Sequence, residues 1–523
     1  MVQNFSLDPA SCENEPIQFI ESIQPFGSLL ALDMSGKIRH AAINDEIGWT
    51  AADLIGKNIE NVLQDSKRVF DAIKDRSEPT SPMLIRESKS RRWITCIAHK
   101  KDDRVIVELE TLPSEQIDIA SLKFMSDRRE SLESYLSYIA ENIRGVTGYD
   151  RVMIYKFGLD WHGEVVAESL NSAGYSFYGH HFPASDIPAI ARNLFTQMWV
   201  RMIPDVDSAN IPLVSDRSEK LDLSRSVLRA PSPIHLQYLR NMGVAASMTM
   251  SLICDGKLWG LVACHHFSPK YLIAEQRAVC ALLAKVVSSR ITTLSVAATI
   301  NATDDLAAVS TQLCKQFVNG DFVECVRDNK YALLRFLRCD GFSFVAEDGC
   351  IVTEGHAISS DELGVLVENL NETKMEVFAT DSIEKSFPVL ASLNMIAAGI
   401  LAIKVLNNWF IWNRHELVRS LLWAGDPNKP VYTNNRFESL SPRTSFESWK
   451  ENVRGTSAAW EHFEVTAADR FRRSIAETVE HRRVPVRADA HEYLRLIRSA
   501  IDSQAADLQN QFKNLNLEGI EVE

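Results

Sequence analysis

Short apolar runs alternate with polar turns over roughly the first 110 residues, a pattern typical of strands in an antiparallel sheet. One apolar run covers Ser28–Asp33, and a run with alternating polar positions follows at Lys37–Ala42. Two further strands are predicted at Arg92–Ala98 and Arg104–Leu109, and the turn Lys101–Asp103 would join them as an antiparallel pair. The pattern predicts a small sheet domain in this region.

The next region combines a helix with a second set of strands. Apolar residues recur at three- and four-residue spacing from Ser121 to Ile143, which predicts a helix. The predicted strands are Val152–Phe157, Glu164–Glu168, Ala246–Cys254 and Trp259–His265. A long excursion before the third of them contains a short helix that Pro188 begins. A sensor-type antiparallel sheet flanked by helices fits this order.

No glycine or proline occurs in Tyr271–Asn319, which predicts a long helix joining two domains. A further mixed domain follows, with strands predicted at Tyr331–Arg338 or Leu401–Val405. Residues Gly425–Arg454 form a polar, turn-rich excursion, and an excursion of that length within a domain is usually functional. Helical patterns then lie on either side of Pro485.

Composition narrows the class of protein. The 523 residues suggest three or four domains at roughly 150 residues each. The net charge of −13 argues against a nucleic-acid-binding protein, which needs clustered excess lysine and arginine. Nine cysteines without a C-x-x-C pair indicate a reduced, cytoplasmic protein. The N-terminus has no export signal, and the apolar run Met395–Ile403 is too short to span a bilayer, so no membrane association is predicted.

Three motifs bring candidate binding residues together. GHHFPASDIPAIARNLF (Gly179–Phe195) contains Ser185 and Asp186, which in an isolated S-D-x-P would be read as helix caps. RAPSPIHLQYLRNMGV (Arg229–Val244) places His235 and Tyr238 one turn apart on a short helix.

The third motif is WGLVACHH (Trp259–His266), a strand. Its alternation puts four residues on one face of the sheet, namely Trp259, Leu261, Ala263 and His265. A lone histidine on an apolar strand is more often a core residue than a ligand-binding one. The combination of three motifs favours a binding site.

These motifs together resemble the chromophore domain of the phytochromes. Cys12 in SCENEPIQFIESIQPFG resembles the attachment segment of the bacterial members, and WAGDP and PRTSF (Pro442–Phe446) resemble the two ends of the family's tongue hairpin. The resemblance implies an α/β (α+β) fold with three sensor-type antiparallel-sheet domains joined by long helices, and a knot near the N-terminus. The implied segments are an N-terminal extension at 1–16, PAS at 17–115, GAF at 120–300, PHY at 301–515 with the tongue at about 421–456, and a tail at 516–523.

The resemblance implies the cofactor biliverdin IXα, a linear tetrapyrrole attached through the thiol of Cys12. Arg201 and Arg229 would bind the two propionates, because forked guanidinium donors suit carboxylates. The residues implied to assist them are Ser232, His235, Ser247 and Thr249. The carbonyl of Asp186 would accept from the pyrrole nitrogens, and His265 would hydrogen-bond the last ring. The residues implied to complete the pocket are Tyr155, Phe182, Ile187, Pro188, Phe195 and Tyr238.

The resemblance also implies a mechanism. Light would rotate the double bond between the third and fourth rings, and the tongue would switch between a strand pair and a helix. Asp186 would pair with Arg443 in one state, with Ser445 as a substitute contact. The other tongue residues implied to signal are Trp423, Gly425 and Pro442. The implied partners are a second copy in a homodimer and an output domain or response regulator.

The sequence departs from the family pattern at several positions, of which Phe195 is near the last ring. Phe195 stands where tyrosine is common, which removes a hydroxyl, and Phe26 stands where histidine is usual. His180 stands where members with a far-red-absorbing resting state often have glutamine, which favours a red-absorbing resting state.

Two other classes of function compete with a photosensor. The first is a regulatory module of the same fold that binds another small molecule, such as a cyclic nucleotide, without photochemistry. The second is an enzyme, but Cys264 and His265 would point to opposite faces of a strand. His491–Glu492 loosely resembles the phosphoacceptor of histidine kinases, although too few residues follow for an ATP-binding domain. We therefore predict that this chain is not itself an enzyme.

Overall fold

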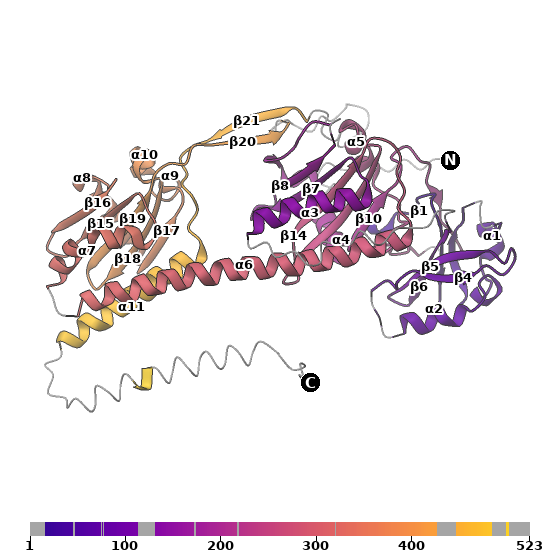
Figure 1. Cartoon of the computed structure of the whole chain (residues 1–523), viewed down its shortest axis with the longest axis horizontal. Helices are drawn as coiled ribbons and strands as arrows, with labels where there is room; N and C mark the ends of the chain where they lie inside the picture. The colour runs from indigo at the N-terminus through magenta and orange to yellow at the C-terminus, as the bar shows by residue number, and fades with distance from the viewer. Residues whose placement is uncertain are drawn as a thin grey trace. The chain divides into compact units, whose positions relative to one another are not determined.

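The computed structural model describes residues 16–44, 48–74, 76, 78–112, 131–171, 174–216, 219–318, 321–425, 446–483 and 498–500. The chain divides into two units, which are Met1–Thr299 with Arg419–Val453, and Ile300–Val418 with Arg454–Glu523 (Figure 1). The segment Arg419–Val453, from the second half of the chain, therefore belongs to the first unit.

The N-terminal sheet of the first unit has the strand order β12-β3-β2-β6-β5-β4. Its strands are β2 (Ser28–Leu32), β3 (Ile38–Ala42), β4 (Met83–Arg86), β5 (Trp93–Lys101), β6 (Arg104–Thr111) and β12 (Val214–Ser215). The four strands expected here from the sequence are confirmed, and β5 and β6 form the expected antiparallel pair. One face packs beneath the helices α1 (Ala51–Leu54) and α2 (Ser66–Ile73) in a core that includes Leu54 and Val69. The opposite face of the sheet carries Glu108 and Glu110.

The second sheet has the strand order β10-β13-β14-β7-β8-β9-β20-β21. Its strands are β7 (Arg151–Phe157), β8 (Gly163–Leu170), β9 (His180–Phe182), β10 (Val200–Ile203), β13 (Ala246–Cys254), β14 (Lys257–His266), β20 (Arg419–Ala424) and β21 (Ser448–Val453). The helices of this region are α3 (Leu132–Thr147), α4 (Ala189–Gln197), α5 (Pro233–Asn241) and the first part of α6 (Ala274–Gln316). The antiparallel sheet with flanking helices is as expected, and the last two strands come from far along the chain.

The helix α3 differs from its expected bounds. It begins at Leu132 because the hydroxyl of Ser131 accepts a hydrogen bond from the amide of Ser134, and it ends before Gly148, whose φ is 65°. Residues 113–130, which include the start of the helix expected from Ser121, lie outside the described residues. The helix also continues one turn beyond Ile143.

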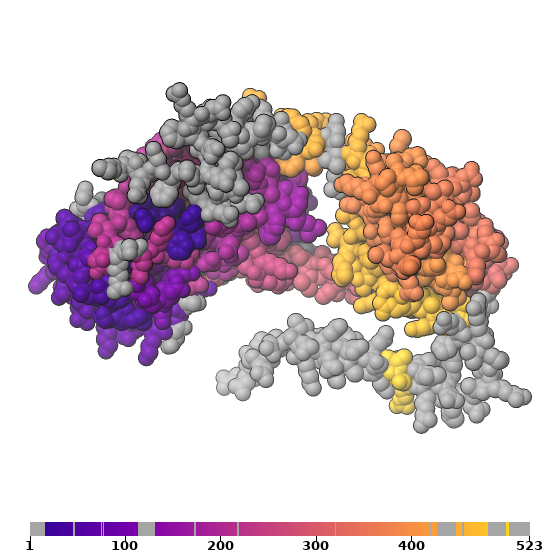
Figure 2. Space-filling model, turned by 180° about the vertical axis from the view of Figure 1, so that it is seen from behind, coloured from indigo at the N-terminus to yellow at the C-terminus, as the bar shows by residue number. Residues whose placement is uncertain are grey.

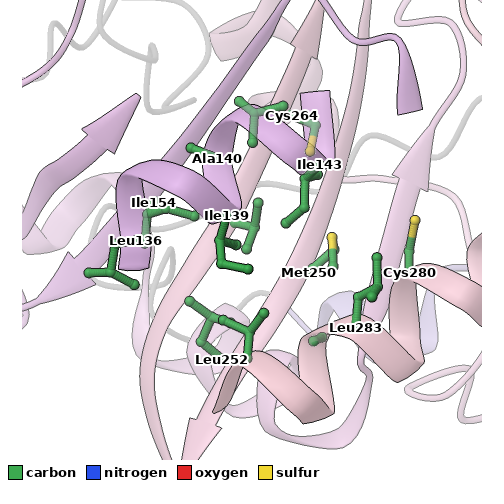
Figure 3. Close-up of a cluster of buried hydrophobic side chains, with 14 of the residues drawn as sticks. Leu136, Ile139, Ala140, Ile143, Ile154, Met250, Leu252, Cys264, Cys280 and Leu283 are labelled. Atoms are coloured by element: carbon green, nitrogen blue, oxygen red, sulfur yellow. The ribbon is translucent and has the colours of Figure 1, made fainter. Parts of the chain in front are cut away.

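The helices α3 and α6 cover one face of the second sheet. Side chains from both helices and from β7, β13 and β14 meet in one buried cluster (Figure 3). The labelled members are Leu136, Ile139, Ala140, Ile143, Ile154, Met250, Leu252, Cys264, Cys280 and Leu283. Because successive strand residues alternate in direction, the residues next to Met250 and Cys264 face the other side of the sheet.

The prediction that Trp259 lies on that other face is wrong. Trp259 packs against the core of α3 and α6, whereas Leu261 belongs to the cluster on the opposite face. The cause is a bulge, since Leu252 pairs with Gly260 but Ile253 pairs with Leu258. The extra residue reverses the direction of the strand's alternation at this point.

The N-terminal segment is bound to the long excursion of the second sheet. The strand β1 (Ser22–Ile23) pairs with β11 (Ile211–Pro212), and the short 3-10 helix η2 (Ile17–Phe19) precedes it. The Gln24 amide donates to the carbonyl oxygens of Met202 and Val227 at 3.0 and 3.1 Å. Figure 2 shows this indigo segment against magenta residues of the excursion. These are contacts expected of a knot near the N-terminus.

The second unit contains a five-stranded sheet of order β16-β15-β19-β18-β17. Its strands are β15 (Gly341–Val345), β16 (Ile351–Gly355), β17 (Val377–Thr380), β18 (Gly399–Val405) and β19 (Asn408–Arg414). Its helices are α7 (Phe322–Phe336), α8 (Ser360–Thr373), α9 (Ile383–Ser386), η8 (Pro388–Leu393), α10 (Asn394–Ala397) and α11 (His462–Arg483).

The strand expected at Leu401–Val405 is confirmed within β18, but the one expected at Tyr331–Arg338 is wrong. Most of that segment lies in α7, which Asp321 caps by accepting from two backbone amides. Its buried residues Val326, Leu333 and Phe336 lie at helical spacing on one face.

The long helix expected from Tyr271–Asn319 is confirmed as α6. Among the described residues it is the one helix that is long and apolar enough to cross a membrane by length and composition alone, and 39% of its most apolar window is buried. Part of that apolar character is used in protein cores, since Leu283 and Val287 are buried in the first unit and Leu313 in the second.

Candidate functional site

One face of the second sheet collects the residues that the sequence singles out. Arg201 on β10 pairs with Thr249 on β13, which pairs with Ala263 on β14. Two residues along the strands, Ser247 pairs with His265. Side chains two residues apart on a strand share a face, so these groups lie opposite the core of α3 and α6.

The Arg201 guanidinium is turned toward backbone carbonyl groups. It donates to the carbonyl oxygens of Ser226 and Val227 at 3.2 and 2.7 Å, and also to that of Arg229. Desolvation, with a further contribution from the nearby Arg229 guanidinium, holds the pKa of Arg201 well below its usual value. Carbonyl oxygens solvate the cation without neutralising it.

Arg201 is partly buried, whereas the second arginine is buried. Arg229 is 6% exposed and donates to the carbonyl oxygen of Ile17 at 2.8 Å, and its Nε has no hydrogen-bond partner among the described residues. Burial lowers the pKa of Arg229 to about 10. No described carboxylate lies within ion-pair distance of Arg201 or Arg229. Asp222, which is near Arg229, pairs with Lys101, and Glu108, which is near Arg201, accepts from Ser226 and Leu228. Two neighbouring desolvated cations without a described ion-pair partner favour an anionic ligand.

The helix α5 presents two rings toward this face. Ser232 accepts a hydrogen bond from the amide of Ile234 at 3.3 Å as the N-cap, and His235 stacks on Tyr238 with 6.2 Å between ring centroids. Desolvation by surrounding protein, followed by the Arg201 charge, lowers the pKa of His235 to about 4. The His235 side chain is nevertheless exposed to solvent.

His265 is buried on the strand β14 with its Nδ1 lacking a hydrogen-bond partner among the described residues. Burial, followed by the Arg151 charge, lowers the pKa of His265 to about 3, so its imidazole is neutral at neutral pH. The adjacent Cys264 lies in the core on the other face, and burial raises the pKa of its thiol well above the usual range. The separation of Cys264 from His265 is as expected and excludes them as a nucleophile pair.

An aromatic cluster continues the same face toward β7. Its buried members include Tyr155, Phe157 and Phe182, with Ile187 and Phe195 packed against them. The Tyr155 ring lies 5.8 Å from that of Phe182, measured between centroids.

Gly163 makes room for the Tyr155 ring. An added Cβ at this glycine would lie 1.7 Å from the ring's Cζ, so the ring occupies the place of a side chain. The sequence does not mark this glycine as a site residue, because an isolated glycine at the start of a strand has many explanations.

The loop before α4 connects this cluster to α5. Asp186 ends the short helix η7 (Ala184–Asp186), and Pro188 is the residue preceding the first turn of α4. The Tyr238 hydroxyl donates to the Asp186 carboxylate with 3.0 Å between Oη and Oδ2. The structure therefore joins two of the three sequence motifs by a side-chain hydrogen bond.

The hairpin of β20 and β21 docks on the edge of the same sheet. The strand β20 pairs in parallel with β9, where Trp423 is opposite His181, and the Trp423 indole donates to Glu451 at 2.6 Å. Gly425, with a φ of 88°, donates its amide to the carbonyl of Glu447 at 2.9 Å. A hairpin was expected here, and its first strand carries Trp423 as the resemblance implied.

Just before β21, the Phe446 ring packs nearly perpendicular to the Tyr238 ring, with 5.0 Å between centroids and 85° between the ring planes. Phe446 lies in the PRTSF motif, but the sequence alone does not single it out as a site residue. Several expected residues lie outside the described residues, namely Cys12, Pro442, Arg443, Ser445, His491 and Glu492.

Comparisons with known proteins agree along the chain. A PAS-fold model matches residues 12–112, a GAF-domain model matches 131–291, and a phytochrome-region model matches 306–484. Cyanobacterial phytochrome B of Nostoc sp. is 33% identical over 90% of this chain, and a bacteriophytochrome of Pseudomonas aeruginosa is 31% identical over 90%. The chain spans 66% of the length of each of these relatives. It spans 80% of a bacteriophytochrome of Xanthomonas campestris that is 30% identical.

Solved structures give the same result. A bacteriophytochrome from the photosynthetic bacterium R. palustris superposes with a TM-score of 0.79 at 30% identity, covering 90% of this chain and 99% of that one. The photosensory core module of a Stigmatella aurantiaca phytochrome gives 0.77 at 33% identity, covering 91% and 99%. The chain therefore belongs to the phytochromes and carries the PAS, GAF and PHY domains of their photosensory core.

Proposed function

We propose that this chain binds biliverdin IXα on the face of the second sheet that carries Arg201, Thr249, Ser247 and His265, and that it senses red and far-red light. The observation that carries the proposal is the desolvated pair of Arg201 and Arg229, neither of which forms an ion pair with a described carboxylate. A tetrapyrrole with two propionates supplies two carboxylates, and each forms strong charge-assisted hydrogen bonds with a guanidinium. The unpartnered Arg229 Nε fits such a ligand.

The remaining polar groups can each be assigned to one part of the pigment. Ser232, Ser247 and Thr249 offer hydroxyl groups near the two arginines, and His235 adds an imidazole. The neutral His265, whose Nδ1 is buried without a described partner, would hydrogen-bond the carbonyl of the last ring. The carbonyl of Asp186 would accept from the pyrrole nitrogens.

The apolar walls suit the rest of a large conjugated ligand. Tyr155, Phe182 and Phe195 present ring faces and edges, and Ile187, Pro188 and Tyr238 are the other wall residues of the proposal. Cys12, which precedes the described residues, would supply the thiol that attaches the pigment. When bound, the pigment supplies light absorption and rotation about one double bond.

We further propose how the protein responds. Asp186 and Tyr238 would hold the last ring's surroundings in one state, and the hairpin would change its pairing when those contacts are exchanged. Arg443 and Ser445 would be the hairpin's partners for Asp186, with Trp423, Gly425 and Pro442 in the segments that move. This is a bistable element biased by a local change of contacts.

The output is also a proposal. The chain would act as a homodimer that regulates an attached output domain or a separate response regulator, and catalysis would belong to that domain or partner. We propose a cytoplasmic protein without nucleic-acid or membrane partners. The proposed domain limits are 17–115 for PAS, 120–300 for GAF and 301–515 for PHY, with the tongue at about 421–456.

A buried arginine pair would also suit the phosphate of a nucleotide, which is the competing sensor hypothesis. Incubation of the purified chain with biliverdin distinguishes the two. We expect a coloured product that stays attached in denaturant, and we expect Cys12→Ala to lose the covalent attachment while keeping some noncovalent colour. A covalent product with Cys12→Ala contradicts the attachment site, and binding of cyclic nucleotides without biliverdin uptake contradicts the photosensor.

A further inference from the structure

A buried carboxylate organises the loop that faces the hairpin. Glu168 on β8 has a side chain that is 4% exposed, and it accepts hydrogen bonds from the backbone amides of Phe177 and Tyr178 at 3.1 and 3.2 Å. The hydroxyl of Ser176 also donates to Glu168, at 2.5 Å. One carboxylate thus fixes three consecutive residues of the loop 174–179, which lies between β8 and β9.

Arg151 supports that carboxylate from the ligand face. Its side chain is 3% exposed, its Nε lies 3.2 Å from the Glu168 Oε1, and its guanidinium donates to the carbonyl of Tyr175 in the same loop. Arg151 is also the cross-strand neighbour of His265. The guanidinium stacks over the Phe177 ring at 4.7 Å from its centroid. The pair therefore connects the strand beside His265 with the loop.

The loop ends at His180, which contacts the hairpin. The His180 Nε2 lies 3.0 Å from the hydroxyl oxygen of Ser448 on β21 and 3.2 Å from that of Tyr175. The Nδ1 lies 3.3 Å from the carbonyl oxygen of Tyr178, which can only accept, so the neutral ring carries its proton on Nδ1. The Nε2 then accepts a hydrogen bond from a hydroxyl, and Ser448 is placed to donate it.

We propose that Glu168, held by Arg151, positions the loop 174–179 so that His180 receives Ser448, which links the ligand face to the hairpin by a route separate from Asp186. The role of Glu168 is positional, since it touches neither the proposed pigment nor the hairpin. The role of this contact in light signalling rests on the proposed function. The docking of the hairpin through His180 and Ser448 can nevertheless be measured without pigment.

The proposed route rests on the energetic cost of losing the Glu168 carboxylate, and not only on residues that lie next to one another. Glu168→Gln leaves Arg151 buried without its anionic partner and leaves one neutral amide oxygen to accept from the three loop donors, so the loop is held less strongly in its present conformation. A coupling claim nevertheless requires a measured interaction between the two ends, which a double-mutant cycle supplies.

Amide hydrogen exchange of the full chain, read by mass spectrometry over Ser448–Val453, tests the proposal. Glu168→Gln and Ser448→Ala are each expected to raise exchange in this strand by roughly threefold to tenfold, the range for loss of one hydrogen bond. The double variant is expected to exchange no faster than the more affected single variant. Glu141→Gln, which removes one negative charge at an exposed position on α3, is the matched control and should leave the strand unchanged.

Ser176→Ala keeps the proposal testable if Glu168→Gln does not fold, because it removes only the exposed hydroxyl that donates to Glu168. It should raise exchange of the hairpin strand in the same direction. Faster exchange of the loop 174–179 with an unchanged hairpin, or strictly additive effects of Glu168→Gln and Ser448→Ala, would overturn the inference. Failure of the wild-type chain to take up biliverdin would instead overturn the proposed function, and the exchange comparison would still stand.

Discussion

The hydroxyl of Tyr238 donates to the carboxylate of Asp186 across 3.0 Å, while the same ring makes a T-shaped contact with the ring of Phe446, just before the second hairpin strand. Tyr238 therefore contacts both the loop before α4 and the returning end of the hairpin. One ring thus joins the two contacts. This arrangement gives Tyr238 a place in the proposed response to light.

Replacement of the Tyr238 hydroxyl alone tests that place. Tyr238→Phe keeps the ring against Phe446 but removes the donor to Asp186, at a cost of about 1 kcal/mol in the free energy of unfolding. We expect biliverdin uptake to persist and the extent of photoconversion to fall severalfold, measured as the red-minus-far-red difference spectrum. Tyr178→Phe, at an exposed ring, is the control. Full photoconversion of Tyr238→Phe would contradict the proposed role.

The desolvated arginines Arg201 and Arg229 predict that the ligand must carry carboxylates. Arg229→Gln should weaken biliverdin binding by roughly tenfold to a hundredfold, the equivalent of one or two charge-assisted hydrogen bonds. Biliverdin with both propionates esterified should bind the wild-type chain with a similar deficit, and Arg229→Gln should weaken binding of the ester little further. Equilibrium titration followed by absorbance measures both, with Arg68→Gln on α2 as the exposed control.

Equal affinity of the wild-type chain for biliverdin and its ester would show that the arginines do not bind the propionates. Arg229→Lys separates charge from shape, because lysine keeps the cation but not the forked donors. Its affinity should lie between those of the wild-type chain and Arg229→Gln.

Glu108 predicts a pH dependence of stability. Its carboxylate accepts hydrogen bonds from the hydroxyl of Ser226 and the amide of Leu228, both at 2.8 Å, in the segment that also solvates Arg201. Burial raises the pKa of Glu108 to about 7. The folded chain therefore retains a proton that the unfolded chain has lost, so this contribution to stability is present below about pH 4.5 and disappears as the pH rises to about 7.

Glu108→Gln lacks this titration. The stability of Glu108→Gln relative to wild type should rise by roughly 3 kcal/mol between about pH 4.5 and pH 7, measured by urea unfolding of the pigment-free chain. The difference between the two proteins removes the contributions of all other groups. A relative stability that is flat across this range would show that Glu108 does not titrate in it.

Gly163 predicts a steric effect on the aromatic cluster. Gly163→Ala places a Cβ on the Tyr155 ring, so the buried ring must shift, with an expected loss of about 1–3 kcal/mol in the free energy of unfolding. We also expect a shifted absorption maximum of the pigment-bound chain. Gly145→Ala on α3, where an added Cβ meets nothing within 4 Å, should instead be neutral or slightly stabilising. Equal behaviour of the two variants would contradict the close packing of Tyr155.

The sequence predicted the sheet face well where alternation is regular. Ala263 and His265 share a face with Thr249 and Ser247 because the pairing of β13 and β14 is unbroken there. Trp259 was misplaced because a bulge depends on the partner strand and leaves no mark in the alternation of β14 itself. Tyr331–Arg338 was misread because a short apolar run suits a strand as well as a helix, and packing decided for the helix.

Other site residues carry no signal that a single sequence reveals. Glu168 acts through the backbone amides of Phe177 and Tyr178. Every residue except proline has a backbone amide, so the sequence does not show which amides bind this carboxylate. Glu108 acts through Leu228, which is distant along the chain, and its burial depends on the docking of two regions. The motifs were enough to predict the ligand face, whereas the residues that hold this face in place could be identified only from the structure.

Illumination of the biliverdin-treated chain provides the decisive result for a light-driven change in the hairpin. Absorption spectra and amide exchange over Arg419–Ala424 and Ser448–Val453 are recorded after red light and again after far-red light. We predict a reversible spectral change accompanied by a reversible change of exchange in both strands. A pigment-bound chain whose spectrum does not respond, or whose spectrum responds while both strands exchange identically in the two states, would contradict that claim.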